Sequence, residues 1–215
     1  NKVEFDSRKV SDSDLFIAIK GVNVDGHSFA EEAIKSGAKF ALVSKPVSAP
    51  SIVVVDVSQA LLTLAEFVRG RLSEMKVIGI TGSQGKTTTK EFLYSILKSV
   101  GGCVATEANF NTEIGVPLTL LRCKESTKFC IVEMGARHLG DIAKLTKVSS
   151  PDVGVVLAVG SAHIGEFGSI EAIAKTKSEL ITNLSAGKSA VLGSYDSWTP
   201  KMASNLPLEV INFGE

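Results

Sequence analysis

Residues 77–89 carry the clearest chemistry in this sequence. An apolar run ends at Thr81, a loop contains Gly82 and Gly85, and Gly-Lys-Thr then opens a segment with helical spacing. This is the order of strand, phosphate-binding loop and helix. Glycines let successive backbone N–H groups turn toward a phosphate, and the start of the helix adds free N–H groups and the positive end of its dipole.

The predicted phosphate loop gives its residues separate roles. Lys86 would reach the β- and γ-phosphates of a nucleotide, and the Thr87 hydroxyl would ligate Mg²⁺. The strict motif has a further glycine where this chain has Ile80, so an ordinary Gly/Ser turn is the alternative; the flanking strand and helix favour the phosphate loop. The expected nucleotide-binding residues are Gly82, Ser83, Gln84, Gly85, Lys86, Thr87 and Thr88.

Two further residues follow predicted central strands. Glu133 ends the apolar run 129–133, and His163 lies in a glycine-rich loop after the run 153–159. Ligands bind beyond the carboxyl ends of strands in open α/β sheets, where a carboxylate or a neutral imidazole can ligate a metal. The alternatives are that Glu133 only marks where its strand meets solvent and that His163 is an exposed loop residue.

Lys177 interrupts an apolar helical stripe. The stripe contains Ile170, Ile173, Ala174, Leu180, Ile181 and Leu184, and Lys177 occupies a position where an apolar residue is expected, whereas Lys175 lies off this face. Burial would lower the lysine pKa and yield a neutral, nucleophilic amine. The alternative is a lysine at the edge of the stripe whose ammonium reaches water.

Two polar segments have a weaker signal. Arg8, in Asp6-Ser7-Arg8, could bind an anionic group through its guanidinium, or it could form a surface ion pair. The polar loop that contains Asn109, Asn111 and Thr112 precedes a helix expected near Val116. It could bind substrate or simply cap that helix.

Strands and helices alternate along the chain, which predicts an α/β fold with a largely parallel sheet. A helix with Ser58 as its N-cap is followed by a charged stretch, and we place a domain boundary near Glu74. The two expected domains are a small N-terminal α/β substrate domain, residues 1–74, and a phosphate-loop ATPase-like domain, residues 75–215. The expected strands are 15–19, 40–43, 52–55, 77–81, 129–133, 153–159 and 189–192, and the first helix is expected at 28–36.

Composition excludes several classes of protein. Lys+Arg and Asp+Glu both number 23, so the net charge of zero gives no sign of a nucleic-acid or membrane-surface partner. No apolar run approaches the roughly 18 residues that cross a bilayer. The three cysteines lack metal-ligand spacing, which favours reduced thiols in a cytoplasmic protein. The chain begins without methionine.

Several segments together resemble the Mur ligase family. The segments Asp6–Val10, Asp14–Gly21 and Asp25–Phe29 resemble its uridine-diphosphate-binding domain, and Thr81–Thr88 resembles its ATP loop. The segments Asn109–Leu121, Glu133–Arg137, Ala162–Ser169 and Ala174–Glu179 resemble the branch that adds D-alanyl-D-alanine. The resemblance covers nearly the whole chain.

This resemblance implies an ATP-dependent amide ligase of peptidoglycan synthesis. ATP and Mg²⁺ would be its cofactors, UDP-N-acetylmuramoyl-tripeptide and D-alanyl-D-alanine its substrates, and an acyl phosphate its intermediate. Thr87, Glu133, His163 and a carbamoylated Lys177 would ligate metal, and Lys86, His163 and Lys177 would act in catalysis. Ser7, Arg8, Asn109, Asn111 and Thr112 would contact substrate. A monomer is expected, and without the family's C-terminal ligase domain this stretch alone is expected to be inactive.

Three other functions stay open. A sibling Mur ligase or a folylpolyglutamate synthase would share the ATP chemistry, although the Asp-Ser-Arg segment argues against the folate enzyme. A non-catalytic nucleotide-binding module would need neither His163 nor Lys177.

Overall fold

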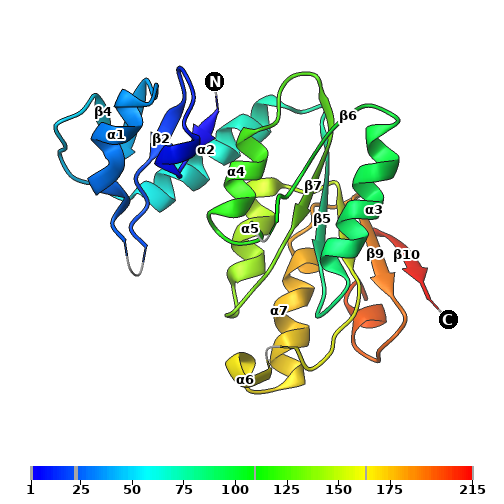
Figure 1. Cartoon of the computed structure of the whole chain (residues 1–215). Coiled ribbons are helices and arrows are strands. Elements are labelled where there is room, and N and C mark those ends of the chain that lie inside the picture. Colours follow the sequence, from blue (N-terminus) through cyan, green and yellow to red (C-terminus); the bar gives the residue numbers. More distant parts are fainter. Residues whose placement is uncertain (1, 22–23, 109, 163, 215) are drawn as a thin grey trace. The chain divides into compact units, whose positions relative to one another are not determined.

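The computed structural model describes residues 2–21, 24–108, 110–162 and 164–214. Two compact units divide the chain, Asn1–Leu64 and Ala65–Glu215, and each is described by itself. The expected α/β fold with parallel sheets is confirmed in both (Figure 1). Among the helices in the described ranges, none combines the length and apolar character that a bilayer crossing requires.

The N-terminal unit contains a four-stranded parallel sheet whose strand order follows the chain. Its apolar core joins Phe16 and Val43 of the sheet to Ala30 and Ala33 of the first helix. The elements are β1 (Val3–Glu4), a 3₁₀ turn (Ser7–Lys9), β2 (Leu15–Ile17), a 3₁₀ turn (Gly26–Phe29), α1 (Ala30–Lys35), β3 (Phe40–Val43), β4 (Ser51–Val53) and α2 (Val57–Arg71), whose end lies in the second unit.

His27 joins two loops of the N-terminal unit. Its Nδ1 lies 2.6 Å from Asp25 Oδ1, and its Nε2 accepts the backbone N–H of Ser44 at 2.8 Å. The Ser44 hydroxyl is also 3.1 Å from Nε2, so Asp25, His27 and Ser44 are arranged as in a nucleophilic triad. Because a backbone N–H already occupies the imidazole lone pair, this group is a structural link between the loops.

The second unit contains a six-stranded parallel sheet in the order β10-β9-β8-β5-β7-β6. The strand that leads into the phosphate loop, β5, is therefore central. The elements are β5 (Lys76–Thr81), α3 (Lys86–Lys98), β6 (Gly102–Ala105), α4 (Gly115–Leu121), β7 (Thr127–Glu133), α5 (Asp141–Ser149), β8 (Val153–Val156), α6 (Ile164–Phe167), α7 (Ile170–Thr182), β9 (Ser189–Gly193), a 3₁₀ turn (Thr199–Lys201) and β10 (Glu209–Phe213).

Helices cover both faces of this sheet (Figure 1). Leu93, Tyr94 and Leu97 of α3 pack against a cluster that contains Ile78, Ile80 and Ile131. On the other face, α7 lies so close to the sheet that a Cβ added at Gly79 would be 3.1 Å from Leu180 Cδ1. Alternation along the strands therefore turns Glu133, like Ile131, toward α3.

The helix α2 contains the division between the two compact units, and its N-cap differs from the expected one. The units divide between Leu64 and Ala65, and the domain boundary expected near Glu74 stays a prediction. Arg69, near the end of α2, donates to Ser149 O at 3.1 Å and to Asp152 Oδ2 at 3.2 Å, so the end of α2 belongs to the second unit. Asp56 and not Ser58 caps α2, because the Asp56 carboxylate accepts the Gln59 N–H at 2.8 Å.

Candidate functional site

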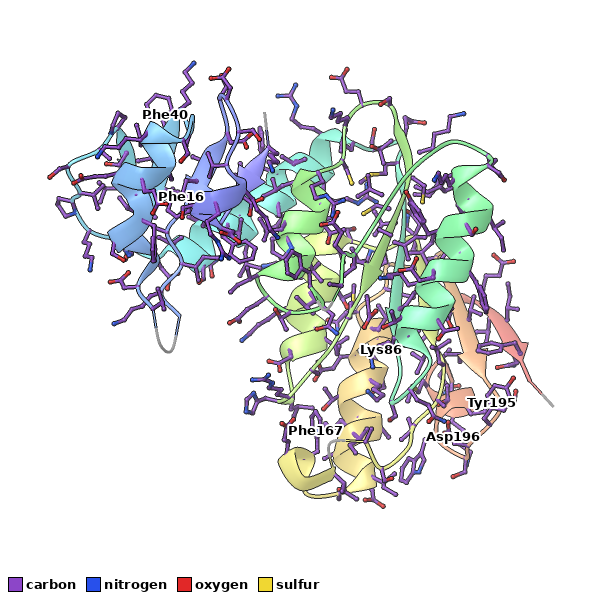
Figure 2. The ribbon with its side chains drawn as sticks, in the orientation of Figure 1. Phe16, Phe40, Lys86, Phe167, Tyr195 and Asp196 are labelled. Atoms are coloured by element: carbon purple, nitrogen blue, oxygen red, sulfur yellow. The ribbon has the colours of Figure 1, made fainter. Side chains whose placement is uncertain are left out.

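The candidate site lies at the carboxyl edge of the six-stranded sheet. Ile80 is in register with Glu133 on β7, and Thr81 is in register with Val156 on β8. The phosphate loop, the end of β7 and the loop after β8 therefore meet at one place, where open parallel sheets bind ligands. Figure 2 shows Lys86 at this end of the sheet, together with Asp196 from the loop after β9.

The segment 82–85 forms the tight turn that its glycines predict. Gly85 is the N-cap of α3 and has φ +82°, a left-handed conformation that favours glycine. The helix begins at Lys86, as expected, and the Lys86 ammonium donates to Gly82 O at 2.8 Å. The Lys86 side chain thus folds back over the phosphate loop. When a nucleotide binds, its ammonium would donate to a phosphate oxygen in place of the Gly82 carbonyl.

Ser83 joins the phosphate loop to the loop after β8. Its N–H donates to Ala158 O at 2.9 Å. Its hydroxyl accepts the Gly160 N–H at 2.8 Å and lies 3.1 Å from Gly160 O. The amide and hydroxyl of Ser83 are therefore engaged within the protein, which makes this residue a link between two loops.

Glu133 is a buried carboxylate, 3% exposed, between two polar side chains. Its Oε2 accepts the Thr87 hydroxyl at 3.0 Å, and its Oε1 accepts the Asn111 amide at 3.1 Å. A carboxylate beside a hydroxyl at a phosphate loop is a set of hard oxygen donors, which Mg²⁺ prefers. The residues present therefore fit this ion.

Lys177 lies on the buried face of α7 and is 9% exposed, whereas Lys175 is exposed. This is the helical phase that the sequence predicts. Burial, and secondly the positive charge of Lys86, lower the Lys177 pKa from 10.5 to about 8. Burial also lowers the Lys86 pKa, against the opposing effect of the Glu133 charge. Two lysines and one carboxylate are therefore coupled electrostatically at the carboxyl edge.

The start of α7 and its close packing fix the position of Lys177. Ser169 is the N-cap, and its hydroxyl accepts the Ala172 N–H at 3.1 Å. Gly79 and Gly154 leave room for the helix, because a Cβ at Gly154 would lie 3.1 Å from Ile181 Cδ1. Small residues on β5 and β8 thus let α7 approach the sheet.

Asp196 is a site residue that the sequence reasoning missed. Its Oδ2 accepts the Val159 N–H and the Thr199 hydroxyl, both at 2.8 Å. It thereby holds the loop that Ser83 contacts, beside a cavity of about 420 Å³ lined by Ser83, Gln84 and residues 158–162. The available signal was an acid in the loop that follows the expected strand 189–192.

The predicted substrate residues of the N-terminal unit lie in a 3₁₀ turn. Ser7 is buried, and the exposed Arg8 guanidinium donates to both Asp6 carboxylate oxygens at 2.8 Å. This hydrogen bonding lowers the Asp6 pKa to about 2. Arg8 therefore forms a surface ion pair in this structure, and its contact with substrate stays a prediction.

The structure describes only some of the remaining predicted site residues. Asn109 and His163 lie outside the described residues. Asn111 contacts Glu133, whereas Thr112 is exposed at the start of the turn before α4. Within the described ranges, which omit His163, no three His, Cys, Asp or Glu side chains gather as a metal cluster. Within these residues, a magnesium site would use the Thr87 hydroxyl and the oxygens of a carbamate on Lys177 together with the Glu133 carboxylate.

A central strand, a glycine turn and a helix that starts at a lysine define a phosphate-loop nucleotide-binding domain. Comparison with known families then matches residues 80–215 to the Mur ligase middle domain and residues 1–70 to the Mur ligase family, catalytic domain. The chain therefore belongs to the Mur ligase family, as the sequence motifs predict.

Individual relatives agree with this assignment. A UDP-N-acetylmuramoyl-tripeptide–D-alanyl-D-alanine ligase of Mycobacterium bovis is 40% identical over 97% of this chain and 46% of its own length. MurF from Acinetobacter baumannii superposes with a TM-score of 0.91 at 34% identity, over 99% of this chain and 48% of that one. MurF from Thermotoga maritima, solved in complex with ADP, gives 0.85 at 37% identity, over 99% and 49%. The chain spans about half the length of the curated relatives it matches.

Proposed function

We propose that the complete protein is an ATP-dependent ligase that joins D-alanyl-D-alanine to UDP-N-acetylmuramoyl-tripeptide in the cytoplasm, a step of peptidoglycan synthesis. Relatives that carry this name match nearly the whole chain. The observation that carries the proposal is the pair of lysines at one sheet edge, Lys86 on the phosphate loop and the buried Lys177. A protein that only binds nucleotide would not need the second lysine, Lys177.

The central physical problem of such a ligase is charge. The tripeptide carboxylate must attack the γ-phosphorus of ATP, although both groups are anionic. Lys86 would bind the β- and γ-phosphates, and the preorganised N–H groups at the start of α3 would stabilise the charge that develops. Mg²⁺, held by Thr87 and Glu133, with His163 as a further expected ligand, would offset the remaining repulsion.

Lys177 would contribute through a carbamate. The lone pair of its neutral amine attacks the carbon of CO₂, a C–N bond forms, one C=O electron pair moves to oxygen, and the nitrogen loses a proton. The lowered pKa supplies the neutral amine near pH 7. The resulting anion would offer hard oxygens to a second Mg²⁺ and would replace a buried positive charge by a negative one.

Substrate residues complete the proposal. Ser7 and Arg8 would contact the uridine diphosphate, which requires Arg8 to exchange Asp6 for a phosphate oxygen. Asn109, Asn111 and Thr112 would contact substrate. We propose that the protein acts as a monomer.

A phosphate-release assay on the complete protein tests the proposal. With ATP, Mg²⁺ and UDP-N-acetylmuramoyl-tripeptide present, we expect phosphate release to depend on D-alanyl-D-alanine. Release with a single amino acid and not the dipeptide would indicate a sibling ligase, and release with a folate and glutamate would indicate the folate enzyme. Nucleotide binding without release under any of these conditions would indicate a non-catalytic module.

A further inference from the structure

Lys90 is a buried lysine with no part in the chemistry described above. It lies on α3 and is only 3% exposed. Its ammonium donates to Thr106 O at 2.8 Å and lies 2.9 Å from the Glu91 carboxylate. Burying an ammonium is costly unless it is paired and hydrogen-bonded, so these contacts stabilise an otherwise unfavourable residue.

Thr106, the acceptor of this hydrogen bond, fixes the end of β7. Thr106 is 2% exposed and follows β6. Its N–H donates to Ile131 O at 2.9 Å, and its hydroxyl oxygen accepts the Glu133 N–H at 3.0 Å. Thr106 therefore bonds both the Glu133 backbone and the Lys90 ammonium, and so links the two residues.

The contacts close into a ring. Glu133 Oε2 accepts the Thr87 hydroxyl at 3.0 Å, and Thr87 and Lys90 are three residues apart on α3, so they lie on neighbouring positions of one helix face. In the described part of the sheet β6 is the outer strand, with β7 as its neighbour. The Lys90 ammonium ties the end of this outer strand to α3.

We propose that Lys90 is a positioning residue for the magnesium site. Through Thr106 it fixes the Glu133 backbone relative to α3, and so sets the separation between the Thr87 hydroxyl and the Glu133 carboxylate. The inference rests on the proposed function, because it takes these two groups as the magnesium ligands.

The test measures the dissociation constant of ADP from the complete protein, with and without Mg²⁺, by isothermal titration calorimetry. Lys90→Met keeps the apolar stem and removes the ammonium. Thr106→Val keeps the shape and the carbonyl group but removes the acceptor of the Glu133 N–H. Lys98→Met, which changes an exposed lysine on the same helix, is the matched control.

We expect Mg²⁺ to tighten ADP binding in the wild type and in Lys98→Met. In Lys90→Met and Thr106→Val this tightening should fall by roughly tenfold or more, the size of outer-shell effects at metal sites. Metal-free ADP affinity should stay near the wild-type value, since the phosphate loop is untouched. A merely structural role would lower the melting temperature without changing the ratio of the two dissociation constants.

The outcomes separate the two proposals. No effect of Mg²⁺ in the wild type would overturn the proposed function, and this inference with it. Wild-type tightening that both variants retain would overturn the inference alone. If Lys90→Met also loses metal-free ADP binding, Thr106→Val alone is used for the comparison, because it leaves the lysine in place. Loss of the Mg²⁺-dependent tightening in Thr106→Val then supports the inference, and its retention overturns it.

Discussion

Replacing Lys177 by methionine should stabilise the protein at neutral pH. Lys177 is buried and its pKa is lowered from 10.5 to about 8, so below pH 8 the folded state holds a buried charge that the unfolded state holds in water. The difference between the two pKa values corresponds to about 3 kcal/mol at pH 7 by linkage. Methionine fills a similar volume without this charge.

The sign of the pH dependence follows from the direction of the shift. Between pH 8 and 10.5 the unfolded state binds more protons than the folded state, so wild-type stability rises with pH. The advantage of Lys177→Met should therefore be fully present below pH 8 and should shrink to about 1 kcal/mol by pH 10. The exposed Lys175→Met should show neither effect.

Thermal unfolding in magnesium-free, CO₂-depleted buffer measures this difference. At roughly 2–4 °C per kcal/mol for a domain of this size, we expect Lys177→Met to raise the melting temperature of the transition that contains the six-stranded sheet by about 6–12 °C at pH 7. A melting temperature equal to or below the wild-type value at pH 7, or an advantage that grows toward pH 10, would show that Lys177 does not destabilise the fold as a buried charge.

Two activity predictions and one stability prediction concern the complete protein. Lys177→Ala should nearly abolish ligation and be partly rescued by a short carboxylic acid in the buffer, while Lys175→Ala stays active; the opposite order would refute the carbamate assignment. Lys86→Ala should lower kcat by at least about 10²-fold in a phosphate-release assay with the fold intact by circular dichroism, and near-normal turnover would exclude the phosphate-loop role. Gly154→Val should crowd α7 against the sheet and cost about 1–3 kcal/mol in denaturant unfolding, because even a Cβ would lie 3.1 Å from Ile181 Cδ1 of that helix; an unchanged midpoint would contradict this packing.

Local patterns predicted much of the site. The strand, glycine turn and helix around Lys86 depend on residues that are neighbours in the sequence. The helical spacing around Lys177 likewise predicted its burial, because one helix face carries the apolar residues. The roles of these residues in catalysis stay predictions.

Features that depend on long-range contacts could not be predicted in this way. Asp196 acts on Val159, and Thr106 on Glu133, across strands that meet only in the folded sheet. The attachment of the end of α2 to the second unit could not be predicted, because Arg69 is a surface-type residue in the sequence, yet it bonds the distant Asp152. The N-cap of α2 was expected at Ser58, but Asp56, whose residue type suits that position equally well, accepts the Gln59 N–H.

The path of one oxygen atom shows whether the protein forms an acyl phosphate. In the proposed reaction a carboxylate oxygen of the tripeptide becomes the bridge of the acyl phosphate and leaves with phosphate when the dipeptide amine attacks. The complete protein would be supplied with ATP, Mg²⁺, D-alanyl-D-alanine and UDP-N-acetylmuramoyl-tripeptide labelled with ¹⁸O in its terminal carboxylate, and the released phosphate would be analysed by mass spectrometry. We expect one ¹⁸O atom in each released phosphate, whereas unlabelled phosphate formed together with the ligated product would exclude an acyl-phosphate intermediate.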